Sequence, residues 1–192
     1  MSLKQRFFNY LGRHFKPIMI GKIRNSEGNI ISQTRISSTT HLGNSENLSL
    51  GSNVYIGHYN MIDASNGVSI AEGCQLTNYI SILTHSSHIA IRLYGSEYTN
   101  QKKPKAYFRG EVKVGKYTFI GPHTVIMPGT EIGKGSLISA YSYVKGTFEK
   151  FSIIAGNPAK RVGDTRELDK PYLEKHPELK EFYDSWSNSE AK

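Results

Sequence analysis

The chain has 192 residues, with 24 Lys or Arg against 16 Asp or Glu, and a formal net charge of +8. No apolar run approaches the ~18 residues needed to cross a bilayer, so we expect no transmembrane segment. We also expect no nucleic-acid partner, because no binding motif accompanies the charge, which suits a phosphate-bearing ligand equally well. A single cysteine, Cys74, excludes an internal disulfide and makes the cytoplasm the expected compartment.

Residues 1–22 are predicted to form a short amphipathic segment. Phe7, Leu11 and Phe15 recur at four-residue spacing, which places them on one side of a helix. The segment lacks the continuous apolar stretch of a signal peptide. We expect it to cap the open end of the repeats that follow, and peripheral contact with a membrane is the alternative.

A six-residue repeat dominates residues 23–162. Irregular units over residues 31–49 precede two regular blocks, and a two-residue slip at Val68–Ser69 interrupts the first block. In the second block, the fifth place of five successive units is Thr or Ser. The first place of each regular unit is aliphatic: Leu50, Ile56, Ile62, Ile70, Leu76, Ile82, Val114, Ile120, Ile126, Ile132, Ile138 and Val144.

A period of six differs from the helical 3.6 and from simple strand alternation. It suits a short strand followed by a corner, with the aliphatic side chain pointing inward. Three such units complete one triangular coil, so we predict an all-β solenoid of stacked parallel coils. Cys74, in the fifth place of its unit, is expected in the core and not as a nucleophile. A β-sandwich with chance periodicity would not keep this spacing.

Two segments leave the pattern. Residues 88–111 form an excursion with a basic QKKPK stretch, and long loops in repeat proteins often carry binding functions. Residues 163–192 follow the last repeat and are predicted to be a helical tail, in which Pro171 and Pro177 each suit a first helical turn.

These repeats resemble the hexapeptide-repeat acyltransferases, and are closest to the polysaccharide and sugar O-acetyltransferases. The resemblance covers about residues 48–162 and is clearest in VGKYTFIGPHTVIMPGTEIGKGSLISAYSYV and in IIAGNPAKRVG. It implies a left-handed parallel β-helix and a homotrimer. It also implies that acetyl-CoA binds as a co-substrate in the groove between neighbouring prisms.

Two histidines are candidates for the general base that the resemblance implies. In related enzymes a catalytic histidine ends a coil within a stretch such as ILTHSSHIAIRLYG. The expected place, counted from Ile82, is Ser87, so His88 lies one residue late and His85 two residues early. We favour His88 because it begins the excursion, and assign His85 to packing or hydrogen bonding. Imidazole suits the task because its ordinary pKa is near neutrality.

A histidine-bound zinc site, as in the carbonic anhydrases that share this prism, does not fit the order and spacing of His85, His88 and His123. We therefore expect no metal. The remaining coil histidines, His41, His58 and His123, are expected to face outward.

The resemblance also implies where acetyl-CoA binds. Ala140 stands where pantetheine runs along a coil, and Lys145 lies one coil edge further on. Lys160 and Arg161 match the place where basic residues meet the cofactor phosphates. The structural alternative is that these are solvated or packing side chains.

Four residues are candidates for binding a saccharide acceptor. Asp63 and Asn66 lie in the coil before the histidines, and Arg92 and Tyr94 lie in the excursion. Each of them has a purely structural alternative.

The resemblance implies O-acetylation of a sugar hydroxyl of a polysaccharide or its precursor, by direct transfer in a ternary complex. N-acetylation of a nucleotide-linked amino sugar is an alternative, because one histidine base serves either acceptor. A non-catalytic trimeric scaffold is the alternative outside the enzymes, but a scaffold has no need of a THSSH coil end and a basic excursion.

Overall fold

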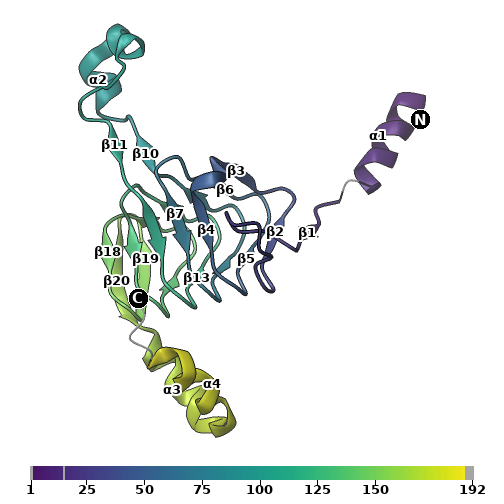
Figure 1. The fold of residues 1–192 in the computed structure, drawn as a ribbon, viewed down its shortest axis with the longest axis vertical. Coiled ribbons are helices and arrows are strands. Elements are labelled where there is room, and N and C mark those ends of the chain that lie inside the picture. Colours follow the sequence, from purple (N-terminus) through teal and green to yellow (C-terminus); the bar gives the residue numbers. More distant parts are fainter. Residues whose placement is uncertain (1, 15, 189–192) are drawn as a thin grey trace.

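A computed structural model describes residues 2–14 and 16–188 and shows a triangular prism of stacked coils (Figure 1). Three parallel sheets form its faces, and successive strands visit them in turn. This is the left-handed parallel β-helix that the resemblance implies.

The strands of each face follow a regular order along the prism. The first face contains β2 (Arg35–Ser37), β5 (Tyr55–Ile56), β8 (Gln75–Leu76), β13 (Phe119–Ile120), β16 (Leu137–Ile138) and β19 (Ser152–Gly156). The second face contains β3 (His41–Gly43), β6 (Met61–Asp63), β9 (Ser81–Ile82), β14 (Val125–Ile126) and β17 (Tyr143–Val144). The third face contains β4 (Leu48–Leu50), β7 (Val68–Ile70), β12 (Val112–Val114), β15 (Glu131–Ile132) and β18 (Thr147–Phe148). Two antiparallel strands extend the first face, β1 (Met19–Ile20) beside β2 and β20 (Ala159–Asp164) beside β19.

The first residue of the regular hexads points inward, as predicted; all are buried in the core except Leu50, which is partly buried against it. Ile56 pairs with Leu76, Leu76 with Ile120, and Ile120 with Ile138, so one aliphatic column runs along the first face. Every member of this column is fully buried, and Cys74 is buried in the same core. Burial raises the pKa of the Cys74 thiol to about 12, which leaves it without thiolate at neutral pH.

The hydroxyl in the fifth place has a defined partner at the corner. Thr124, Thr130, Ser136 and Ser142 are buried, and each Oγ donates to the carbonyl oxygen three residues earlier at 2.7–2.8 Å. A buried hydroxyl is stable only when it is paired in this way. The repeated glycine in second place has a steric reason: a Cβ at Gly133 would lie 2.3 Å from the Lys150 backbone nitrogen on the next coil.

The excursion leaves the corner between the second and third faces. Its ends pair as an antiparallel ribbon of β10 (His85–Ser86) and β11 (Phe108–Arg109). Its outer part contains α2 (Ala90–Tyr94) and the 3-10 helix η2 (Gly95–Asn100) and projects away from the prism (Figure 1). A second 3-10 helix, η1 (Ser45–Asn47), occupies the same corner of the first coil.

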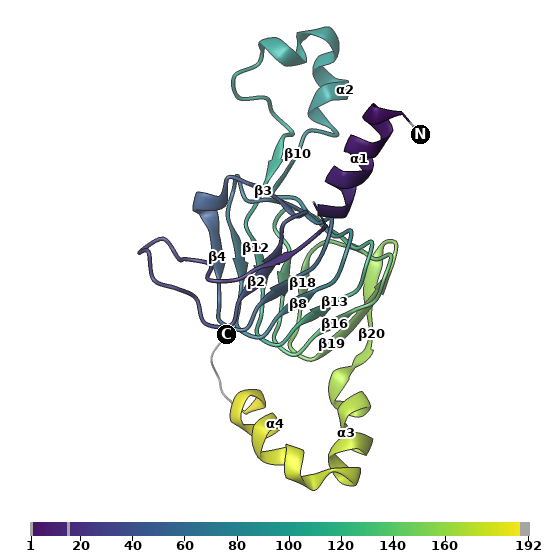
Figure 2. The same cartoon turned by 90° about the vertical axis from the view of Figure 1, so that its right-hand side faces the viewer.

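An N-terminal helix, α1 (Leu3–His14), forms as predicted. It stands beyond the first coil and does not cover it (Figures 1 and 2). The capping role of residues 1–22 stays a prediction; within one chain β1 pairs with β2 of the first coil, and Ile23, one residue after the segment, packs against the core. Of the residues used for that prediction, Phe15 and the Leu11 side chain lie outside the described part. No helix of the described residues is both long enough and apolar enough to cross a membrane.

The C-terminal tail contains α3 (Thr165–Lys175), η3 (Pro177–Leu179) and α4 (Lys180–Ser187). Pro177 begins a helical turn as predicted. The prediction for Pro171 is wrong: it lies inside α3, because the Asp164 side chain caps the helix seven residues earlier by accepting from the Arg166 N–H. Trp186 anchors the tail, with its ring 4.6 Å from that of Tyr117.

Replacing Ile120 with Ala should lower the free energy of unfolding by about 2–5 kcal/mol, because it opens a cavity in the aliphatic column. Phe119→Ala is the control on the same strand, and should cost roughly 1 kcal/mol or less because that side chain is partly exposed. Urea denaturation at one protein concentration measures both. Equal losses would contradict the inward assignment of the first hexad place.

Candidate active site

The candidate site lies at the corner where the excursion leaves the prism. Strands β6 and β9 pair in register, Ile62 opposite Ile82, so the corner after β6 lies directly beside the corner after β9. This stacking brings Asp63 of one coil to His85 of the next, with 2.7 Å between Asp63 Oδ2 and His85 Nδ1. The pair joins a carboxylate and an imidazole that are 22 positions apart in the sequence.

Asp63 is held ionised by the corner around it. Its Oδ1 accepts from the Ser65 N–H at 3.0 Å, and its Oδ2 accepts from the Thr84 N–H and hydroxyl at 3.3 and 3.0 Å. Partial burial alone would raise the pKa of Asp63, but these hydrogen bonds from Ser65 and Thr84 outweigh it and lower the pKa below its ordinary value. The carboxylate is therefore negative throughout the neutral range.

The carboxylate fixes the orientation of His85. With Asp63 at 2.7 Å, Nδ1 carries the hydrogen, and Nε2 is the acceptor nitrogen. Ser65 Oγ also lies 3.1 Å from Nδ1, and the ring of Tyr107 stacks on the imidazole with 5.8 Å between centroids. The Arg109 guanidinium covers the Tyr107 ring at 4.3 Å. Because 43 % of the His85 side chain is exposed, the imidazole remains accessible to a substrate.

His88, which the sequence favoured as the base, has a different environment. Its Nδ1 lies 2.8 Å from Ser86 Oγ, and its ring stacks on Phe108 with 5.1 Å between centroids. A hydroxyl donates or accepts equally well, so it neither fixes the tautomer nor stabilises an imidazolium as a carboxylate does. Lys145, one of the residues predicted for acetyl-CoA, lies 5.6 Å from the centre of the Phe108 ring.

The residues predicted for the acceptor divide between the corner and the excursion. Asn66 is part of the corner network: its N–H donates to Thr84 Oγ1, and its Nδ2 donates to Ser65 Oγ. Arg92 donates to the carbonyl oxygen of His88, and the Tyr94 hydroxyl accepts from the Lys105 N–H at 3.0 Å. These two contacts lie within the excursion and stabilise its fold.

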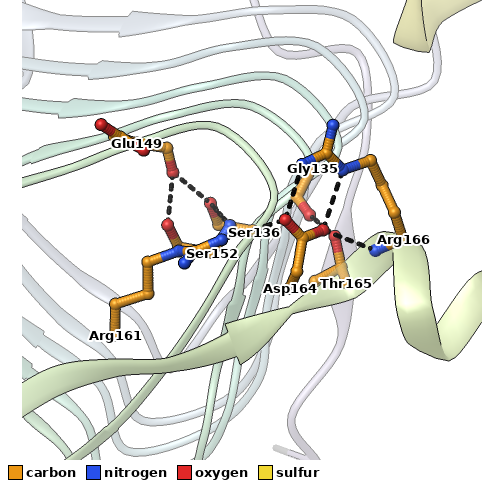
Figure 3. A network of polar contacts seen from close by, with 8 residues as sticks. All are labelled: Gly135, Ser136, Glu149, Ser152, Arg161, Asp164, Thr165 and Arg166. Atoms are coloured by element: carbon orange, nitrogen blue, oxygen red, sulfur yellow. Dashed lines mark hydrogen bonds and ion pairs between the residues drawn. The ribbon is translucent and has the colours of Figure 1, made fainter.

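The other residues predicted for acetyl-CoA lie elsewhere on the prism. Ala140 follows β16 at the corner between the first and second faces, and Lys160 and Arg161 lie on β20. Arg161 shares Asp164 with Arg166, at 3.0 and 2.7 Å (Figure 3). The Arg166 side chain in particular lowers the pKa of Asp164 to about 2. One chain therefore does not bring Ala140, Lys160 and Arg161 to His85.

Ser65, Thr84, Tyr107 and Arg109 complete the site and were not found from the sequence. The hexad register could have indicated Ser65 and Thr84, though weakly, because it places their two corners side by side. No sequence pattern indicates Tyr107 and Arg109, because they reach His85 only through the β10–β11 pairing.

The coil histidines lie outside this site. His123 stacks between Tyr79 and Tyr141, with centroids 4.9 and 4.8 Å away, on an outer corner of the prism. Within the described residues, no three His, Cys, Asp or Glu side chains gather in the manner of a metal site.

Known proteins share the repeat and the fold. The family described as bacterial transferase hexapeptide (six repeats) matches residues 106–146. Serine acetyltransferase 2 of Arabidopsis thaliana is 31 % identical over 128 residues, 67 % of this chain and 36 % of that protein. The dTDP-4-amino-4,6-dideoxy-D-glucose acyltransferase of Escherichia coli is 28 % identical over 113 residues, 57 % of each. The chain thus spans about a third to three fifths of the length of these two relatives.

A solved structure agrees with this fold. A hexapeptide-repeat acetyltransferase from Vibrio cholerae O1 biovar eltor, complexed with acetyl-CoA, superposes with a TM-score of 0.60. It is 16 % identical, and the match covers 85 % of this chain and 79 % of that one. Fold and repeat define a left-handed β-helix of the hexapeptide-repeat class. The comparisons confirm the predicted resemblance to the hexapeptide-repeat acyltransferases.

Replacing Asp63 with Asn should lower the free energy of unfolding at pH 7 by about 1–3 kcal/mol, because the donors of Ser65 and Thr84 lose an ionised acceptor. The folded-state pKa of Asp63 is lowered, so its stabilisation is complete above the ordinary value of 3.8 and is lost as the pH falls through the folded value. The difference between the two chains should therefore shrink as the pH falls below 3.8, as measured by urea denaturation.

Asp169→Asn is the control of opposite sign. Burial raises the pKa of Asp169, so ionisation of this carboxylate destabilises the fold as the pH rises. The free energy of unfolding of the variant should therefore increase relative to that of the wild type between low pH and pH 7. A difference for Asp63→Asn that stays constant with pH would contradict the ionised state of Asp63.

Proposed function

We propose that this chain is an acetyl-CoA-dependent O-acetyltransferase that acts on a sugar hydroxyl of a polysaccharide or its precursor. The observation that carries the proposal is the 2.7 Å contact between Asp63 and His85 at an exposed corner. An ionised, partly buried carboxylate behind an accessible imidazole is the arrangement that general-base catalysis needs. The relatedness to acyltransferases supplies the type of reaction.

In this proposal His85 Nε2 accepts the proton of the acceptor hydroxyl as its oxygen attacks the thioester carbonyl carbon. Asp63 stabilises the imidazolium that forms and keeps Nε2 directed outward. Collapse of the tetrahedral adduct breaks the carbon–sulfur bond, and the imidazolium returns the proton to the departing CoA thiolate. The acetyl group passes directly to the acceptor, so both substrates bind together and no residue is acylated.

The geometry favours His85 over His88 as this base, which reverses the preference drawn from the sequence. Of the two histidines, His85 has a carboxylate partner at 2.7 Å, whereas an imidazolium at His88 would face the Ser86 hydroxyl. A carboxylate stabilises an imidazolium more strongly than a neutral hydroxyl does. His88 is therefore proposed as a residue of the acetyl-CoA or acceptor surroundings.

Acetyl-CoA is proposed to bind where two chains of a homotrimer meet. Ala140 and His85 lie at different corners of the prism, so a groove that contains both needs the corner of a second chain. Lys145, Lys160 and Arg161 are proposed to meet the cofactor, the last two at its phosphates. Arg161 would share its guanidinium between Asp164 and a phosphate. The single buried cysteine makes the cytoplasm the proposed compartment.

The acceptor is proposed to bind between the corner and the excursion. Asn66 lies one residue from Ser65, which contacts the imidazole, and Arg92 and Tyr94 lie on the excursion above it. N-acetylation of a nucleotide-linked amino sugar is the second candidate, and it is favoured by the similarity to the E. coli dTDP-sugar acyltransferase. A scaffold gives no reason for an ionised carboxylate behind an exposed imidazole.

His85→Ala should lower kcat by roughly 10²- to 10⁴-fold, the usual contribution of a general base. His88→Ala is the matched control in the same loop, and should stay within about tenfold of the wild type. CoA thiol release is measured with acetyl-CoA and a panel of saccharides and nucleotide-linked amino sugars. The buried Cys74 thiol, with its raised pKa, adds little background to a thiol reagent.

Both variants should keep a rise in Tm with acetyl-CoA, because both retain Lys145, Lys160 and Arg161, the residues proposed to meet the cofactor. An inactive His88→Ala with an active His85→Ala would transfer the base to His88. Full activity in both variants would exclude a histidine base.

A further inference from the structure

The positive charge of the chain is concentrated at its N-terminal end. Residues 1–24 contain six basic residues and no acidic residue, and the first acidic residue is Glu27. The rest of the chain carries 18 basic and 16 acidic residues, so it contributes only +2 of the net charge of +8. The six basic residues are Lys4, Arg6, Arg13, Lys16, Lys22 and Arg24.

The apolar side of α1 is turned toward solvent. Leu3, Phe7 and Tyr10 recur at helical spacing on one side of the helix, and their exposed fractions are 88, 58 and 59 %. At 100° per residue, Lys4 and Arg6 flank this apolar side on its two edges. Apolar side chains bordered by cations are typical of helices that lie in a bilayer interface.

Exposed basic and apolar side chains also follow α1 in the sequence. Lys16 is exposed, and the next residues include Ile18 and Ile20, with exposed fractions of 61 and 46 %. Figures 1 and 2 show α1 beyond the first coil, at the opposite end of the prism from β20. A flat surface that approaches this end meets α1 before it meets the coils.

We propose that residues 2–14 and 16–24, the N-terminal basic segment, bind an anionic bilayer surface. Leu3, Phe7 and Tyr10 enter the boundary between headgroups and acyl chains, and Lys4, Arg6 and Lys16 contact anionic headgroups. This attachment holds the first-coil end of the prism against the membrane. The proposal is independent of the reaction at His85.

Charge decides between a membrane and a second copy of the chain as the occupant. Residues 1–24 contain six basic residues and no acidic one, which favours a partner rich in negative charge, and the remainder of this chain is itself slightly positive. Glu27 and Glu46, near the first-coil end, are too few to balance them. An anionic leaflet strengthens binding by roughly fivefold for each Lys or Arg near it, whereas the remainder of a second copy offers a net charge of +2.

The test is flotation of the full chain with vesicles of phosphatidylcholine alone and of phosphatidylcholine with about one third phosphatidylglycerol. We expect binding to the anionic vesicles that weakens with added salt, and at least tenfold weaker binding to the neutral ones. Lys4→Glu/Arg6→Glu and, separately, Leu3→Ser/Phe7→Ser should each weaken anionic binding at least tenfold.

Two control variants carry the same types of substitution at positions outside the N-terminal basic segment. Lys102→Glu/Lys103→Glu alters two exposed lysines of the excursion, and Tyr172→Ser/Phe182→Ser alters two exposed aromatic residues of the tail. Both controls should bind anionic vesicles like the wild type. Light scattering and Tm measurements should show an unchanged assembly and fold in all four variants.

Three results would overturn the proposal: no binding to anionic vesicles, binding that the N-terminal variants leave unchanged, or an equal loss in the controls. If the N-terminal variants dissociate the assembly and the wild type does not bind vesicles, the segment is an interface between copies instead.

Discussion

The register of the parallel coils is the constraint on which the rest of the structure depends. The parallel strands of each face pair with strands one coil away, so one inward aliphatic residue lies over another, as Ile62 does over Ile82. The same pairing stacks the corners. At the corner beyond β6 and β9 it gives Asp63 a position beside His85 that no local feature of the sequence would provide.

The two-residue slip in the repeat and the excursion belong to this same corner. Between β6 and β7 the chain needs a longer turn, and in the next coil the whole excursion replaces that turn. The longer turn supplies Ser65, whose hydrogen bonds, with those of Thr84, outweigh the burial of Asp63 and keep it ionised. It also supplies Asn66, whose N–H donates to Thr84 Oγ1. At this irregular corner the side chain of Asp63 accepts hydrogen bonds from Ser65 and Thr84. At the regular corners the Thr and Ser hydroxyls donate to backbone carbonyls of the coil instead.

The hexad pattern was sufficient to predict the solenoid, its inward residues and the excursion. A period of six with an aliphatic first place permits few other structures, and the buried hydroxyls of Thr124 and Ser142 have a corner partner in each unit. The tail was predicted as helical, but Pro171 was a poor marker of its start, because the capping carboxylate of Asp164 set the boundary. The helix at the N-terminus was also predicted, yet no sequence pattern indicated that it would stand off the prism.

Counting hexad positions along the chain could not decide between His85 and His88 as the base. The count from Ile82 considers one coil, whereas the partner of the imidazole comes from the coil before it. The sequence predicts Asp63 as an acceptor-binding residue. Its contact with His85 could not be predicted, because that contact depends on how the two coils stack. Tyr107 and Arg109 depend on the return of the excursion along β11, which the hexad pattern does not describe.

The central claim is that Asp63 and His85 act as one unit in acetyl transfer, and a double-mutant cycle on kcat tests it most directly. Asp63→Asn, His85→Ala and the combined variant are compared with the wild type by CoA thiol release. If Asp63 acts through His85, the combined variant is no slower than His85→Ala alone, since the carboxylate has no imidazole left to orient. If the two losses multiply, Asp63 acts independently of His85 and the account of this site is wrong.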